Sequence, residues 1–382
     1  MNENAKIAGE ATGGLNEPPA FASAGGGQRG DFGRADVFEW KLPPAVLDVL
    51  LKDRTTGRNI VWGTRDYERA FGAGTGFGEN DEIRREQIAD RERPVIRPRV
   101  VKDAAEQRRR SVDHAEVFTP SWVCNAQNNL VDAAWFRAKS APFNRELRDR
   151  KTGAMTWKTN LKRITRFPKG ATWTDYVLLR RLEVACGEAP YLTSRYDAVT
   201  GSYIPAANRI GILDRKLRLI GENVPKDRPE VWFDMAKWAL KSVYAFDWQG
   251  DNVLLARENL VYAIVEAFTE DYALPDKPLF TEKSLLELAE IVSWNVWQMD
   301  GIRFVVPNSC HDEQAPTLPD LFANDAAAAP SAPKAKPCPG CKAHDVLRHN
   351  GTRCQVMNWE TNTVEEFLPE AAQTAAGKEV RE

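Results

Sequence analysis

The sequence predicts a protein of the α/β class, built on an open parallel sheet. Three short apolar runs, at 182–186, 243–247 and 294–299, have the length and composition of buried strands. Segments with apolar residues at helical spacing lie between them. Strands that alternate with helices are typical of a parallel sheet with helices on both faces.

Each predicted strand ends at a residue suited to ligand binding. Leu182 to Cys186 leads into Gly187, and a glycine lets backbone amides approach a ligand closely. Val243 to Asp247 closes on a carboxylate that could accept both hydroxyls of a ribose, and Trp294 to Met299 is followed by Asp300, which could accept from an adenine amine. Ligands of open parallel sheets bind beyond the carboxyl ends of the strands, so Gly187, Asp247 and Asp300 are predicted to converge on one cleft. The simpler interpretations are a loop glycine, a helix N-cap and a plain turn.

Helices are predicted before and after the second strand. A segment from 232 to 243 and another from 253 to 267 carry apolar residues at helical spacing. A further helix is predicted to begin at Thr281, because threonine is a favoured N-cap residue.

Residues 116–302 resemble the N6-adenine DNA methyltransferases of restriction–modification systems. Glu116-Val117-Phe118-Thr119-Pro120 is similar to the family's F-x-T-P or F-T-P motif, which helps to hold the methionine end of the cofactor. The run from Leu182 to Leu192 is similar to the L-D-P-A-C-G-S-G-x-F-L cofactor loop, and Phe246-Asp247 to the segment whose acidic residue binds the ribose. Gln298 to Ile302 resembles the x-G-D-A-L segment beside the adenine. A closer resemblance is to bacterial proteins described as restriction endonuclease subunit M.

The resemblance implies a Rossmann-like, S-adenosylmethionine-dependent methyltransferase fold, with a sheet that is incomplete in this chain. It also implies a set of cofactor-binding residues: Phe118, Thr119, Pro120, Glu183, Cys186, Gly187, Asp247 and Asp300. The cofactor loop departs from the family pattern, because Glu183 replaces the usual aspartate, Val184 the proline, and Ala189-Pro190 the second glycine. The long spacing from Gly187 to Asp247 predicts an insertion at 194–230.

The catalytic motif of that family is missing from the sequence. Methylation of an adenine amine needs a polar group and a stacking aromatic around a base taken out of the duplex. The family supplies both from an Asn/Asp-Pro-Pro-aromatic loop, whereas the Pro-Pro pairs of this chain, Pro18-Pro19 and Pro43-Pro44, lack the aromatic residue. Catalytic residues therefore stay unknown, and a partner chain is one possible source of them.

Composition divides the chain into five parts. Residues 1–35, rich in Gly, Ala and Ser, are predicted to be disordered, and 36–310 to form the methyltransferase-like domain. An Ala/Pro-rich linker is predicted at 311–337, a small Cys/His module at 338–368 and a polar tail at 369–382.

The small module is predicted to be a zinc knuckle. Cys338-Pro339-Gly340-Cys341 is a C-x-x-C pair, Cys354 would be the third ligand, and His344 or His349 the fourth. About 30 residues bury too little apolar surface to fold unaided, so a metal would supply the stability. The alternative is a tail of reduced cysteines, because the six cysteines do not form a disulfide pattern.

A local basic segment is the candidate DNA contact, because the net charge of −2 excludes binding by bulk charge. Between Arg137 and Lys169 the chain has 11 Lys and Arg against two acids, with Trp157 and Phe167 interleaved. Such a segment can neutralise phosphates while an aromatic stacks on bases, although a solvated surface is the alternative. The candidate DNA-binding residues are Lys158, Lys162, Arg163 and Arg166.

These observations predict an S-adenosylmethionine-binding component of an adenine-specific DNA methyltransferase, in a restriction–modification or phage-related setting. The predicted partners are DNA and a catalytic or endonuclease subunit. The alternative is a non-catalytic DNA-binding or assembly subunit with the same fold. A nuclease is less favoured, because Pro225-Lys226-Asp227 and Pro319-Asp320 lack a partner E/D-x-K motif. No apolar run is long enough for a membrane span and no secretory signal begins the chain, so the cytoplasm is expected.

Overall fold

The computed structural model describes residues 42–89, 94–102, 104–114, 116, 119–272, 280–313 and 336–368. The segment predicted to be disordered (1–35), Phe118, most of the predicted linker and the polar tail lie outside the described residues. The helices are α1 (Pro44–Leu50), α2 (Asp66–Phe71), α3 (Arg85–Ile88), η2 (Arg99–Val101), α4 (Ala104–His114), α5 (Ser121–Phe136), α6 (Trp173–Leu178), η3 (Ala206–Asn208), α7 (Ile212–Asn223), α8 (Pro229–Lys241), α9 (Gly250–Asp271), α10 (Glu282–Asn295), α11 (Pro339–Ala343) and η4 (Val346–Arg348). The strands are β1 (Asn144–Arg148), β2 (Met155–Thr159), β3 (Arg181–Val184), β4 (Val243–Asp247), β5 (Val296–Gln298), β6 (Gln355–Asn358) and β7 (Thr363–Glu366).

The central sheet consists of β3, β4 and β5, which lie parallel in that order. Helices α7 and α8 connect β3 to β4, and α9 and α10 connect β4 to β5. This confirms the predicted α/β class as a mixed α/β fold with a small sheet, and each predicted strand lies where expected. The third strand, β5, begins at Val296 and not at Trp294 as predicted, because α10 continues to Asn295.

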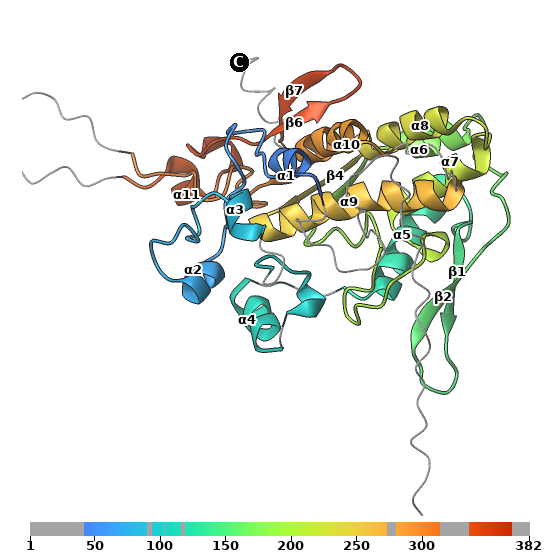
Figure 1. Ribbon diagram of the computed structural model, residues 1–382, viewed down its shortest axis with the longest axis horizontal. Helices are drawn as coiled ribbons and strands as arrows, with labels where there is room; N and C mark the ends of the chain where they lie inside the picture. The colour runs from blue at the N-terminus through green and yellow to red at the C-terminus, as the bar shows by residue number, and fades with distance from the viewer. Residues whose placement is uncertain are drawn as a thin grey trace, which may run out of the picture.

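The two faces of the sheet are covered differently. Val243, Ala245 and Val296 belong to the main apolar core, which the helices α7, α8, α9 and α10 share (Figure 1). Phe246 and Trp297 belong to a second cluster on the opposite face, which contains no helical residue. Helices were predicted on both faces, but residues near the C-terminus cover the second one.

The predicted helices that follow β3 and β4 are confirmed. Thr281 caps α10 as expected, because its Oγ1 accepts a hydrogen bond from the Ser284 N–H at 3.3 Å. The predicted insertion contains α7, whose Leu213, Leu217 and Ile220 are buried in the main core. This segment is therefore an integral part of the fold and not an addition to its surface.

The C-terminal residues pack directly on the sheet. The Phe367 ring lies 4.8 Å from that of Trp297, and the Tyr244 hydroxyl donates to the carbonyl of Met357 at 3.1 Å. The Val306 N–H donates to the Thr352 carbonyl at 2.8 Å, which joins the chain before the undescribed segment to the chain after it. The small module is thus seated on the second face of the sheet.

A two-stranded antiparallel hairpin, β1–β2, projects from the body beside α5 (Figure 1). Its sequence lacks the regular apolar alternation of a half-buried strand, and no strand was predicted there. Contacts with the body hold it instead: Asn144 exchanges side-chain hydrogen bonds with Asn125 of α5, and the Trp157 indole donates to the carbonyl of Asn208 at 2.9 Å.

Candidate functional site

A cavity of about 710 Å³ lies at the carboxyl ends of β3 and β4. Residues 184–188 and 247–249 line one side, and the C-terminal part of α4 with Glu116 and Thr119 lines another. This is the position at which open parallel sheets bind ligands, and the volume is that of a cofactor site. Of the predicted cofactor-binding residues, the cavity brings together Thr119, Glu183, Cys186, Gly187 and Asp247.

Asp247 joins the loop after β3 to the start of α9. One carboxylate oxygen accepts the Gly187 N–H at 2.8 Å, and the other accepts the Gln249 N–H at 2.9 Å. The side chain of Asn252 also donates to it at 3.3 Å. Burial raises the pKa of Asp247, and these donors oppose the rise. Asp247 is not the N-cap residue of α9, because that position belongs to Gln249, whose N–H it accepts. A carboxylate has about four lone-pair positions, so these bonds still leave room for a ligand.

Glu183 is a buried acid beneath the same loop. Its two oxygens accept the N–H groups of Tyr191 and Leu192 at 3.3 and 3.2 Å, which holds the loop closed over the end of β3. Burial raises the pKa of Glu183 to about 8, against an ordinary value of 4.5. The side chain is therefore largely protonated, and uncharged, at neutral pH.

This shift gives a testable pH dependence of stability. The folded protein holds the proton of Glu183 more tightly than the unfolded chain, so the free energy of unfolding should fall as pH rises from about 4.5 to about 8. Glu183→Gln is expected to remove roughly 1–3 kcal/mol of that fall. Urea unfolding at pH 5 and pH 8 measures it, and an equal fall in both proteins would contradict the assignment.

The cavity wall carries more acids than bases. Its acidic residues are Asp113, Glu116, Glu183, Glu188 and Asp247, and its basic residues are Arg99 and Arg195. Both arginines have acidic partners, Glu116 for Arg99 and Glu266 for Arg195. The acids have partners as well, since Glu116 also pairs with Arg110 and Asp113 pairs with Arg69.

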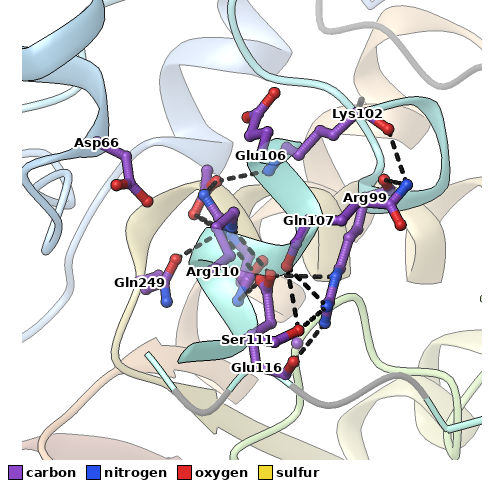
Figure 2. A network of polar contacts seen from close by, with 12 residues as sticks. Asp66, Arg99, Lys102, Glu106, Gln107, Arg110, Ser111, Glu116 and Gln249 are labelled. Carbon is purple, nitrogen blue, oxygen red and sulfur yellow. Dashed lines mark hydrogen bonds and ion pairs between the residues drawn. The ribbon is translucent and has the colours of Figure 1, made fainter. Parts of the chain in front are cut away.

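A buried polar network joins α4 to the first turn of α9 (Figure 2). Arg110 is completely buried, and its guanidinium lies 2.8 Å from the Asp251 carboxylate and 2.9 Å from that of Glu116. Lys102 lies 3.2 Å from the same Asp251, which also accepts from the Tyr67 hydroxyl at 2.6 Å. Glu116 and Gln249 belong both to this network and to the cavity wall. Arg110 therefore anchors the polar helix α4 at the edge of the cavity, a role that the sequence did not reveal.

Asp300 does not lie in the cavity, which corrects the predicted adenine contact. Its carboxylate accepts the N–H groups of Ile302 and Arg303 at 2.9 and 3.0 Å, and Arg303 also forms an ion pair with it. These bonds close a turn after β5, the simpler interpretation of an Asp-Gly pair. Pro120 is the N-cap residue of α5 and does not line the cavity either, while Phe118 lies outside the described residues.

A second candidate site is a cluster of three cysteines and one histidine. Cys310, Cys338, Cys341 and His349 place their ligand atoms within 4.8 Å of one another. The Nδ1 atom of His349 lies 3.6, 3.7 and 3.6 Å from the sulfurs of Cys310, Cys338 and Cys341. A tetrahedral zinc with Zn–S of ~2.3 Å and Zn–N of ~2.0 Å has sulfur–nitrogen edges of about 3.6 Å. The cluster could therefore hold a metal.

The surroundings of the cluster suit thiolate ligands. The Asn350 N–H donates to the Cys338 sulfur at 3.3 Å. Gly340 lets the C-x-x-C turn approach the backbone of His349, because a Cβ at this position would lie 2.4 Å from the backbone nitrogen of His349. The predicted ligands Cys338 and Cys341 thus lie in the cluster.

Two predicted metal ligands lie elsewhere. Cys354 is buried in the second apolar cluster, where its thiol donates to the Gln298 carbonyl at 3.6 Å, and burial raises its pKa well above the ordinary value. His344 is exposed and ends α11 in a left-handed conformation. Cys310 and His349 take their places. The sequence indicated His349 as the other candidate histidine, but Cys310 was missed because it lies 28 positions before Cys338, outside the predicted module.

The predicted DNA-binding residues Lys158, Lys162, Arg163 and Arg166 are all exposed. The aromatic residues interleaved with them, Trp157 and Phe167, are half-buried. Trp157 donates to Asn208, and Phe167 packs against the main core.

No protein-family model, curated protein or solved structure matches the chain. In the part of the chain that the structure describes, no helix has the length and apolar character to cross a membrane.

Proposed function

We propose that this chain is the S-adenosylmethionine-binding component of an adenine-specific DNA methyltransferase, in a restriction–modification or phage-related system. One observation carries the proposal: the cavity at the ends of β3 and β4 is lined by the loop and the carboxylate in which the sequence resembles that family. Gly187 and Asp247, 60 residues apart, are joined there by a hydrogen bond.

The volume of the cavity, about 710 Å³, suits a ligand of the cofactor's size. S-adenosylmethionine carries a sulfonium, an ammonium and a carboxylate group, and both acids and arginines line the wall. Asp247 would hold the ribose, and Glu183 would lie near the methionine end with Thr119. The bound cofactor would supply the activated methyl group, while this chain's residues bind and orient it.

A partner chain would supply the catalytic loop that the sequence lacks. β3 is an edge strand of the described sheet, and its Leu182 and Val184 side chains are 44% and 63% exposed. An unpaired edge with apolar residues invites another strand. Val184 also lines the cavity, so a partner at this edge would sit beside the cofactor.

The alternative proposal is a non-catalytic subunit for DNA binding or assembly. The absence of the Pro-Pro-aromatic motif from the sequence favours it. Methyl transfer to duplex DNA by the chain with its co-expressed partner separates the two, since only the first proposal expects activity.

We further propose that the Cys310, Cys338, Cys341 and His349 cluster binds zinc in a structural role. Three thiolates and one imidazole form a closed tetrahedral set, which leaves no position for a reacting water. The metal would join Cys310, which precedes residues 314–335, to three ligands that follow them. It would thereby hold the C-terminal module against the sheet.

Binding calorimetry with S-adenosylmethionine tests the main proposal. Asp247→Asn is expected to weaken binding by roughly tenfold to a hundredfold, because a charge-assisted hydrogen bond contributes about 1.5–3 kcal/mol. Asp300→Asn is the matched control, another carboxylate at a strand end, and is expected to bind like the wild type. Equal binding by all three proteins would exclude the role of Asp247, and no binding by the wild type would exclude the cofactor.

A further inference from the structure

The basic residues between Arg137 and Lys169 form a run of cations without an acidic partner. All 11 are exposed, and none forms an ion pair within the described residues. Some exposed arginines elsewhere do pair, such as Arg65 with Glu79 and Arg228 with Glu230. The segment therefore keeps its positive charge available to an external ligand.

The two acids of the same segment bind other groups. The Asp149 carboxylate accepts the N–H groups of Lys151 and Thr152 at 2.8 and 2.7 Å within the hairpin turn, and these bonds lower its pKa. Glu146 accepts a hydrogen bond from Asn129 of α5 at 3.0 Å. Neither acid neutralises a cation of the hairpin.

The pleat of the hairpin turns one face away from the body. Asn144, Glu146, Trp157 and Thr159 form hydrogen bonds with α5 or with Asn208. The residues that alternate with them, Arg145 and Leu147 on β1 and Thr156 and Lys158 on β2, lie on the opposite face.

Arg145 and Lys158 are directly opposite each other on this outer face. Like charges in such a pair destabilise a hairpin. A bound polyanion would relieve that repulsion. Arg150 and Lys151 add exposed positive charge at the turn, and Arg148, on the other face of β1, is exposed as well.

We infer that the β1–β2 hairpin contacts the phosphates of duplex DNA through Arg145 and Lys158, with the cations of its turn nearby. This inference rests on DNA as the substrate of the proposed function and names the element that binds it. A two-stranded ribbon fits the major groove, and the hairpin projects from the body (Figure 1). Duplex is favoured over single-stranded DNA, because Trp157 and Phe167 are both half-buried and neither offers a fully exposed ring to bases.

Fluorescence anisotropy with a labelled duplex of arbitrary sequence tests this inference. Arg145→Gln with Lys158→Gln is expected to weaken binding by roughly tenfold to a hundredfold near 0.1 M salt, and to lower the slope of log K against log salt by about 1.8, since each phosphate contact contributes ~0.9. Arg65→Gln with Arg228→Gln removes two exposed but ion-paired arginines and is expected to leave affinity and slope unchanged.

Unchanged affinity and slope in the hairpin variant would overturn the inference, as would a wild type that does not bind duplex. So would a wild type that binds a single strand more tightly than duplex, or one that binds phosphatidylserine vesicles but not DNA. Calorimetry with S-adenosylmethionine on the same hairpin variant separates this inference from the proposed function. Normal cofactor binding with unchanged DNA binding defeats the hairpin alone. Loss of duplex affinity in a protein that never binds the cofactor supports the hairpin and defeats the cofactor.

Discussion

Cys310→Ala is expected to empty the metal site, whereas Cys354→Ala is expected to leave it filled. Cys310 contributes one of four ligand atoms in the cluster, while Cys354 is a neutral buried thiol in the apolar cluster beside the sheet. Elemental analysis should find about one zinc per chain in the wild type and Cys354→Ala, and close to none in Cys310→Ala after dialysis against a chelator.

The histidines provide a second matched pair. His349→Ala is expected to behave like Cys310→Ala, and His344→Ala like the wild type, because His349 alone of the two belongs to the cluster. Metal loss should also free the C-terminal module, since about 30 residues cannot fold on their own apolar surface. Protease cleavage within 338–368 would report this. Zinc retained in Cys310→Ala but lost in Cys354→Ala would contradict the assigned ligand set.

Arg110→Ala is expected to lower the free energy of unfolding by about 3–5 kcal/mol, the usual cost of leaving a buried charge without its partner. The substitution removes the guanidinium that faces both Asp251 and Glu116, and Asp251 is fully buried. Arg109→Ala is the matched control on the same helix. Its 44% exposed side chain forms one ion pair with Asp66, so we expect a loss of less than about 1 kcal/mol. Denaturant unfolding of the two variants checks this, and equal losses would contradict a structural role for the network.

The Asp251 carboxylate of the same network makes the free energy of unfolding depend on pH. Although burial opposes it, Arg110 and Lys102 hold the pKa of Asp251 well below its usual range. The resulting stability is present at neutral pH and is lost as pH falls below about 4. Asp251→Asn should abolish that part of the acid sensitivity. An unchanged acid transition in this variant would show that Asp251 is not the responsible group.

The sequence was sufficient for the centre of the fold. Short apolar runs bounded by Gly or Asp indicated β3, β4 and β5, although Leu182 and Val184 of β3 are exposed and not buried as predicted. Thr281 marked the start of α10, which it caps with a hydrogen bond. Gly187 and Asp247 lie together because parallel strands end at the same edge of a sheet. Asp300 follows the third strand equally well, but its local bonds with Ile302 and Arg303 close a turn instead.

The remainder depends on contacts between segments that are distant in sequence. The β1–β2 hairpin is held by Asn125 and Asn208 rather than by its own strand propensity. The Arg110–Asp251 pair joins residues 141 positions apart, and no local pattern marks either member. Cys310 is similarly distant from the C-x-x-C knuckle. A count of all six cysteines could have drawn attention to it, since Cys310 and Cys124 were the two cysteines given no role.

Hydrogen–deuterium exchange with and without S-adenosylmethionine tests the central claim most directly, because it locates the ligand as well as detecting it. A cofactor in the cavity should slow exchange at residues 183–192 and 247–252, which form its wall at the ends of β3 and β4. The hairpin at 144–159 should exchange at an unchanged rate. Protection confined to these two segments is the result that we expect. No protection at about 1 mM cofactor, or protection only outside the cavity, would contradict the proposed function.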